Sequence, residues 1–66
     1  MKNHLKTLRK QHKLTQQELA QQLNVSRQTV NSIETGKYDP SLSLAFKIAH
    51  SMSLTIEDIF KPNDEN

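Results

Sequence analysis

The sequence predicts a compact all-α fold of five helices, and three observations lead to this prediction. Apolar residues recur at spacings of three and four along most of the chain, which is the period of amphipathic helices. A serine or threonine that can cap a helix precedes four of the five apolar runs. Only one glycine and two prolines interrupt the 66 residues, so we expect a single helical domain over residues 1–66.

The first helix is expected from Asn3 to His12, because Leu5, Leu8 and His12 follow one another at spacings of three and four. Residues 1–13 carry five basic residues and no acidic one, whereas the last ten residues carry four acids and one lysine. A basic patch at one end of a domain is typical of proteins that bind a polyanion. A solvated helix face is an equally open interpretation of the charge alone.

The second and third helices begin at strong capping signals. Thr15 precedes the second helix, and Glu18 completes the pattern of a capping box. Asn24 follows the last apolar residue of this helix and tolerates the left-handed conformation that ends helices. Ser26 caps the third helix, which is expected to end near Glu34.

The remaining elements follow from similar signals. Gly36 supplies the positive φ that ends the third helix, and Ser41 caps the fourth. Thr55 begins a short fifth helix that is expected to contain Phe60, and residues 62–66 are expected to form a frayed tail. The apolar residues of the fourth helix are Leu42, Leu44, Ala45, Ile48, Ala49 and Met52.

Length and composition exclude several classes of protein. A domain of this size buries only about 60% of the surface of its unfolded chain, so a deep catalytic pocket is not expected. The chain has no cysteine, and His4, His12 and His50 match no metal-binding spacing. No apolar run approaches the roughly 20 residues of a membrane span. We expect a soluble protein without enzymatic activity, cofactor, metal or small-molecule ligand.

Residues 15–34 have the pattern of a helix-turn-helix motif, in which two helices are joined by a turn of about four residues. Ala20 is small at the position where the two helices must cross closely. The chain resembles the Cro/cI-type helix-turn-helix repressors, also called the xenobiotic-response-element family, and it departs from many members at Asn24, where they have glycine. The stretches that carry the resemblance are Leu14–Ala20, Val25–Val30, Ile33–Glu34, Gly36–Tyr38, Pro40–Leu42, Leu44–Ala49 and Ile56–Phe60.

The resemblance implies that the third helix enters the major groove of double-stranded DNA. Thr29 and Asn31 flank the apolar Val30, so they are expected to face away from the core. Arginine suits guanine, and glutamine or asparagine suits adenine. An ordinary polar helix face is the alternative. The expected base-reading residues are Arg27, Gln28, Asn31 and Ser32, and the expected contacts to the DNA backbone come from Gln16, Ser26, Thr29, Lys37 and Tyr38. Packing within the loop is the alternative role for Tyr38.

The resemblance also implies a structural ion pair between Arg9 and Glu34. The alternative is that Arg9 binds a phosphate, like its basic neighbours. Short stand-alone members of the family also pair a strand from each terminus. Lys2–Asn3 and the stretch after Phe60 are weak strand formers, so this pairing stays open.

One recognition helix reads only a few base pairs, so useful specificity requires two copies. We therefore expect a homodimer that contacts itself through the fourth and fifth helices, at Phe46, Ile56 and Phe60. Ile56 is alternatively a core residue, as Met52 and Ile59 are expected to be.

The sequence as a whole predicts a sequence-specific DNA-binding transcriptional regulator. We expect a repressor that acts on an inverted-repeat operator, in the cytoplasm of a bacterial or phage-type system and at the nucleoid. The alternative is an antitoxin-type protein-interaction module that also binds its own promoter. A partner gene beside this one would favour the antitoxin.

Overall fold

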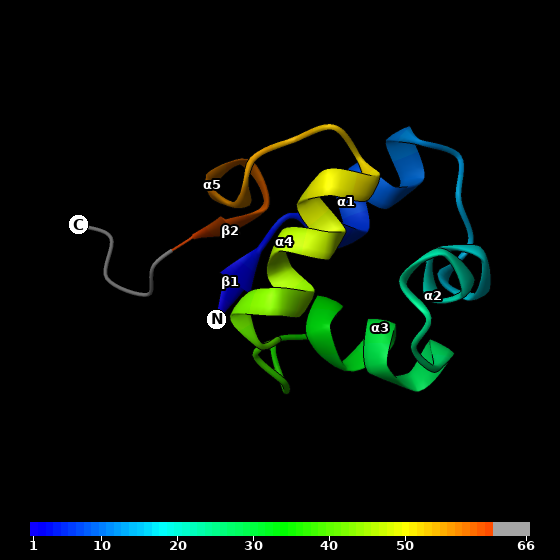
Figure 1. Ribbon diagram of the computed structural model, residues 1–66. Helices are drawn as coiled ribbons and strands as arrows, with labels where there is room; N and C mark the ends of the chain where they lie inside the picture. Colours follow the sequence, from blue (N-terminus) through cyan, green and yellow to red (C-terminus); the bar gives the residue numbers. More distant parts are fainter. Residues whose placement is uncertain (62–66) are drawn as a thin grey trace.

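The computed structural model describes residues 1–61, which form five helices and two short strands (Figure 1). In Figure 1, α4 crosses the middle of the molecule, with β2 and α5 on one side of it and α2 on the other. The helical fold class is confirmed, and the expected tail at residues 62–66 lies outside the described residues. In chain order the elements are β1 (Lys2–Asn3), α1 (Leu5–Gln11), α2 (Gln16–Leu23), α3 (Arg27–Glu34), α4 (Leu42–Ser51), α5 (Ile56–Ile59) and β2 (Phe60–Lys61).

All four expected helix caps form. The side chains of Thr15, Ser26, Ser41 and Thr55 each accept a hydrogen bond from the backbone N–H three residues later. The backbone N–H of Thr15 in turn donates to Glu18 Oε1 at 2.8 Å, which completes the capping box. The start of each of these helices is therefore fixed by the local sequence.

Left-handed residues end the helices, as predicted at two positions. Asn24 has φ 60° and ψ 44°, and Gly36 has φ 79°. Lys13 and Ser53 also adopt positive φ values of 59° and 56°, which the sequence analysis did not anticipate. A lysine or a serine does not predict this conformation, because both residues rarely adopt it.

The two chain ends pair as antiparallel strands, with Lys2 opposite Lys61 and Asn3 opposite Phe60. This confirms the pairing that the sequence left open and corrects two boundaries. The first helix begins at Leu5, not at Asn3, because Asn3 lies in β1 and its Oδ1 accepts a hydrogen bond from the Leu5 N–H at 3.1 Å. Phe60 lies in β2 and not in the fifth helix.

The core joins all five helices to β2. Phe60 is only 7% exposed and belongs to this core, so the expectation that it lies mainly outside the core is wrong. The strand pair accounts for the difference, because it draws Phe60 in beside α5. Leu42 was expected on the apolar side of its helix but is 68% exposed. The buried hydrophobic residues are Leu5, Leu19, Ala20, Leu23, Val30, Ile33, Ala45, Ile48, Ala49, Met52, Ile59 and Phe60.

Candidate nucleic-acid interface

The crossing of α2 and α3 is held at a short turn between the helices. Ala20 is fully buried at the crossing, and its carbonyl accepts a hydrogen bond from the Val25 N–H at 3.0 Å. Lys47 of α4 donates from Nζ to the carbonyl of Leu23 at 3.0 Å, which satisfies a carbonyl at the end of α2. The angle between α2 and α3 is therefore set by backbone bonds, by packing and by a contact from α4.

The two faces of α3 differ in character. Val30 and Ile33 are buried, whereas Arg27, Gln28 and Asn31 are exposed. Figure 1 shows α3 along the lower margin of the molecule. The sequence prediction that a polar run faces away from the core therefore agrees with the burial of the helix.

Several of the expected contact residues lie around one open hollow of about 280 Å³ beside α3. Thr29 and Ser32 are half-buried there, and the side chain of Thr29 is hydrogen-bonded to that of Ser26 at 2.9 Å. The rim of the hollow presents hydroxyl and amide groups. Its lining residues are Ser26, Gln28, Thr29, Ser32 and Tyr38.

The loop after α3 is folded back onto the helix. The backbone N–H groups of Lys37 and Tyr38 donate to the carbonyl of Ser32 at 2.9 and 3.2 Å. Both side chains are exposed, and that of Tyr38 is not packed away in the loop, since the residue is 46% exposed. Lys37 and Tyr38 therefore lie at the opposite end of α3 from Arg27.

Arg9 and Glu34 form the expected ion pair between α1 and the end of α3. Arg9 Nε lies 2.6 Å from Glu34 Oε2, and Arg9 Nη2 lies 3.3 Å from Glu34 Oε1. The two side chains are only 8% and 2% exposed. Arg9 Nη1 also donates to the carbonyl of Leu14 at 2.8 Å, so the guanidinium is engaged within the fold and the alternative of a phosphate contact is not supported.

Gln16 connects this ion pair to the exposed start of α3. Its Nε2 donates to Glu34 Oε1 at 3.0 Å and to Asn31 Oδ1 at 3.1 Å. Its Oε1 accepts from Arg27 Nη1 at 3.4 Å. The sequence analysis assigned Gln16 to the DNA backbone and did not anticipate these side-chain contacts.

Asn3 is a further residue that the sequence analysis missed. Its Nδ2 donates to the carbonyl of Ile33 at 2.9 Å and to that of Met1 at 3.3 Å. It thereby ties β1 to the last turn of α3. This contact joins residues that are thirty positions apart, so no local sequence signal could have indicated it.

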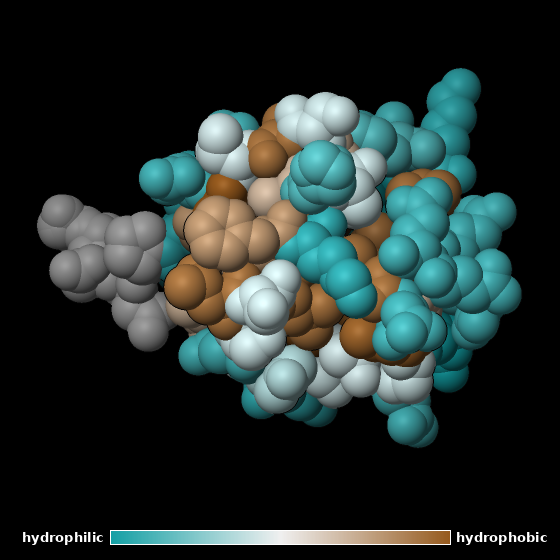
Figure 2. Space-filling model, in the orientation of Figure 1, coloured by the Kyte–Doolittle hydropathy of each residue, from teal (hydrophilic) through white to brown (hydrophobic). Residues whose placement is uncertain are grey.

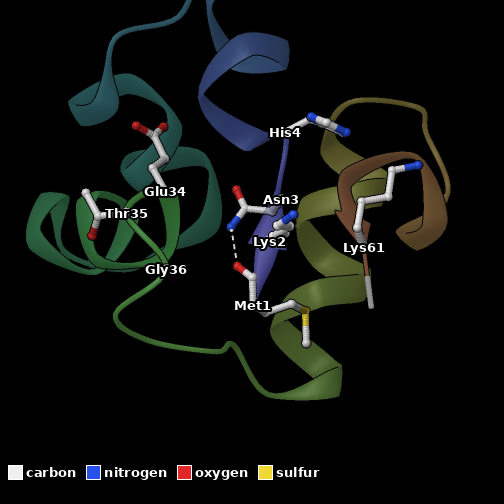
Figure 3. Close-up of a pocket in the computed structure, with 8 residues that line it drawn as sticks. All are labelled: Met1, Lys2, Asn3, His4, Glu34, Thr35, Gly36 and Lys61. Atoms are coloured by element: carbon white, nitrogen blue, oxygen red, sulfur yellow. Dashed lines mark hydrogen bonds between the residues drawn. The ribbon is translucent and has the colours of Figure 1, made fainter. Parts of the chain in front are cut away.

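Figure 3 shows the cavity around this contact, which has a volume of about 470 Å³. It lies between the start of the chain, the end of α3 and β2. The side chains of His4 and Lys61 point away from the bond between Asn3 and Met1 (Figure 3). The lining residues are Met1, Lys2, Asn3, His4, Glu34, Thr35, Gly36 and Lys61.

A second groove, of about 550 Å³, lies between α4 and α5. Two of the three expected dimer residues line it, Phe46 and Ile56, and Phe46 is 58% exposed. Figure 2 shows hydrophobic side chains on the face of the molecule over α4. The other lining residues are Ala49, His50, Leu54, Thr55 and Glu57.

Within residues 1–61, no group of three or more histidine, aspartate or glutamate side chains is arranged to hold a metal ion. In the same part of the chain, no helix has the length and apolar character needed to cross a membrane.

Comparison with known sequences points to one family. A family model described as "Helix-turn-helix" matches residues 5–59. An uncharacterized HTH-type transcriptional regulator of Methanocaldococcus jannaschii is 60% identical over 65 residues, which cover 98% of both chains. The immunity repressor of Bacillus phage phi105 is 38% identical over 55 residues, which cover 83% of this chain and 38% of the repressor.

Solved structures with the same fold include a regulator and an enzyme. An HTH_3 family transcriptional regulator from Vibrio cholerae superimposes with a TM-score of 0.73 at 31% identity, over 83% of this chain and 31% of that one. Hydroxypropylphosphonic acid epoxidase from S. wedmorenis superimposes with a TM-score of 0.76 at 31% identity, over 82% of this chain. The match covers only 29% of the epoxidase, so this chain corresponds to less than a third of that enzyme.

Proposed function

The chain belongs to the Cro/cI-type helix-turn-helix family of DNA-binding transcriptional regulators, and on this premise we propose that it is a repressor that binds an inverted-repeat operator as a homodimer. The main support for this proposal is the burial pattern of α3, which has an exposed polar face and an opposite face that is buried in the core. The likeness to a phage immunity repressor supports repression, which requires only occupancy of a promoter. We also propose that the chain is not an enzyme, because a relative that covers 98% of the chain is named as an HTH-type transcriptional regulator.

The proposed base-reading set is Arg27, Gln28, Asn31 and Ser32. Arg27 and Gln28 lie in the first turn of α3, and the start of a recognition helix is the part that meets base edges. Asn31 lies one turn further on the same exposed side. A bidentate contact from such a residue discriminates against a wrong base by about 1–3 kcal/mol.

The proposed contacts to the DNA backbone flank this set. Gln16 begins α2, whose N-terminal N–H groups can hold a phosphate. Ser26 and Thr29 lie at the start of α3, and Lys37 and Tyr38 follow its end. Contacts at both ends of the helix would fix its register in the groove without reading sequence.

The proposed dimer forms through the groove between α4 and α5. Phe46 is exposed at the groove, and Ile56 is half-buried in it. Phe60 is removed from the proposed interface because the core of the protomer buries it. Two copies related by a two-fold axis would place their recognition helices about 34 Å apart, which is one turn of the duplex.

The test of this function is selection of bound duplexes from a random library by the full chain. We expect two inverted half-sites whose centres are separated by one turn of the duplex. Recovery of duplexes without any common sequence would contradict sequence-specific binding. Recovery of a single half-site would contradict the dimer.

The oligomeric state gives a second test. We expect Phe46→Asp to produce monomers at tens of micromolar in sedimentation equilibrium, because the carboxylate would lose its hydration in the interface. Leu42→Asp is the matched control, since Leu42 is also exposed on α4 but does not line the groove. A dimeric Phe46→Asp protein would overturn the proposed interface.

A further inference from the structure

The side chain of Gln16 contacts both the buried end of α3 and its exposed start. Its amide bonds Glu34 at one end of the helix, Asn31 near the middle and Arg27 at the beginning. Two of these three partners belong to the proposed base-reading set. Gln16, a half-buried residue of α2, therefore influences the orientation of two exposed side chains of α3, those of Arg27 and Asn31.

Glu34 determines which way the amide of Gln16 faces. A carboxylate only accepts hydrogen bonds, so the NH₂ group of Gln16 must face Glu34 and its carbonyl oxygen must face elsewhere. The carboxylate cannot easily turn, because Arg9 donates two hydrogen bonds to it and its side chain is 2% exposed. The Arg9–Glu34 pair therefore holds the carboxylate in one position, and the carboxylate in turn fixes the orientation of the Gln16 amide.

We propose that Glu34 acts through Gln16 as a positioning residue that sets how Arg27 and Asn31 face DNA, an inference that rests on the function proposed above. The oxygen of Gln16 bonds one guanidinium nitrogen of Arg27, which restricts a long and exposed side chain before DNA arrives. The nitrogen of Gln16 bonds Oδ1 of Asn31, which leaves the NH₂ group of Asn31 to face a base.

This arrangement also bears on the base that Asn31 reads. The bond from Gln16 uses one of the two lone pairs of the Asn31 oxygen and holds that oxygen on the side of α2. The NH₂ group of Asn31 is left to donate to acceptors such as O6 of guanine or O4 of thymine. A bidentate contact to adenine would need the remaining lone pair of the oxygen as well as the NH₂ group.

The test compares Gln16→Met with Gln17→Met. The first removes the amide and keeps the length of the side chain, and the second does the same at the neighbouring residue, whose side chain is exposed. Affinity for the selected operator and for each single-base variant is measured at fixed salt. We expect Gln16→Met to lower base discrimination at the positions read by Arg27 and Asn31 by about tenfold, and Gln17→Met to leave it unchanged.

A role of Gln16 limited to phosphate binding predicts a different result. In that case Gln16→Met weakens operator and random duplex equally, with the base preferences intact, and the proposal is overturned. A wild-type protein that binds the operator and its single-base variants equally well would overturn the proposed function itself. This comparison is made before any variant protein is prepared.

A double-variant cycle tests whether Glu34 acts through Gln16. We expect Glu34→Gln to relax base discrimination in the wild-type chain but to have no further effect on it in a Gln16→Met background. All three variant proteins are first shown to be folded by circular dichroism. Additive losses of discrimination in the two variants would show that Glu34 does not act through Gln16 and would overturn the proposal.

Discussion

The two ends of α3 are held in opposite ways. At its start, Arg27 and Gln28 are exposed, and the Ser26 cap is the main backbone contact. At its end, the side chain of Glu34 is 2% exposed and ion-paired, and the carbonyl of Ile33 accepts a hydrogen bond from Asn3. One helix thus combines a solvated end with an end that is built into the fold.

The difference separates two kinds of residue on the same helix. Exposed residues at the start can vary with little effect on stability, so they are suited to determine which sequence is bound. Residues at the end fix the position of the helix, because their contacts reach α1 and β1. We expect substitutions to divide in the same way, and the following measurements test this division.

The largest effect is expected for Glu34→Ala. Removal of one partner from a buried ion pair costs about 3–5 kcal/mol, because it leaves the other charge buried without a partner. Arg9, with a side chain that is 8% exposed, would be left in this state. Urea denaturation checks the prediction, with Glu57→Ala, a change at an exposed residue of α5, as the control. Superimposable transitions for Glu34→Ala and wild type would show that the end of α3 is not held by this pair.

Arg27→Ala and Gln28→Ala are expected to weaken DNA binding and to change stability little, in contrast to Glu34→Ala. Each should lose about 1–3 kcal/mol of specific binding, since each removes a proposed base contact. Stability should change little, because both side chains are exposed. Titrations of operator and random duplex, together with thermal melts, check both halves of the prediction. Unchanged discrimination in both variants would remove the start of α3 from the proposed interface.

The smallest effect is expected for Ser26→Ala, which removes the cap at the start of α3. The side chain of Ser26 accepts a hydrogen bond from the Thr29 N–H at 3.1 Å, and loss of such a cap costs about 1 kcal/mol. Ser41→Ala removes the equivalent bond from α4 and serves as the matched control. Denaturation midpoints measure both losses. A loss at Ser26 as large as that of Glu34→Ala would mean that both ends of α3 are equally important for stability.

The parts of the fold that depend on neighbouring residues were predictable. Caps such as Thr15 and Ser26 and the left-handed Asn24 are local signals, and the structure contains each of them. The pairing of Asn3 with Phe60 joins residues at opposite ends of the chain, and strands of two residues are too short to show an alternating pattern. The burial of Phe60 depends on that pairing, so it was missed as well.

In the candidate site, too, local features could be predicted from the sequence, whereas contacts between distant residues could not. The polar face of α3 could be predicted from the buried positions of Val30 and Ile33. The Arg9–Glu34 pair could be predicted only from the resemblance to a family. The contacts of Gln16 depend on how α2 and α3 meet, and a sequence pattern within one helix carries no such information.

The strand pair between the chain ends has a consequence for the order of folding. Its formation closes a loop of almost the entire chain. The free-energy cost of closing such a loop, which is entropic, is on the order of 3–4 kcal/mol. The helices close only short loops, so we expect them to assemble first and the strands to join last. The amide of His4, which donates to the carbonyl of Ile59 at 2.7 Å, should then exchange its hydrogen with solvent faster than amides in the middle of α2.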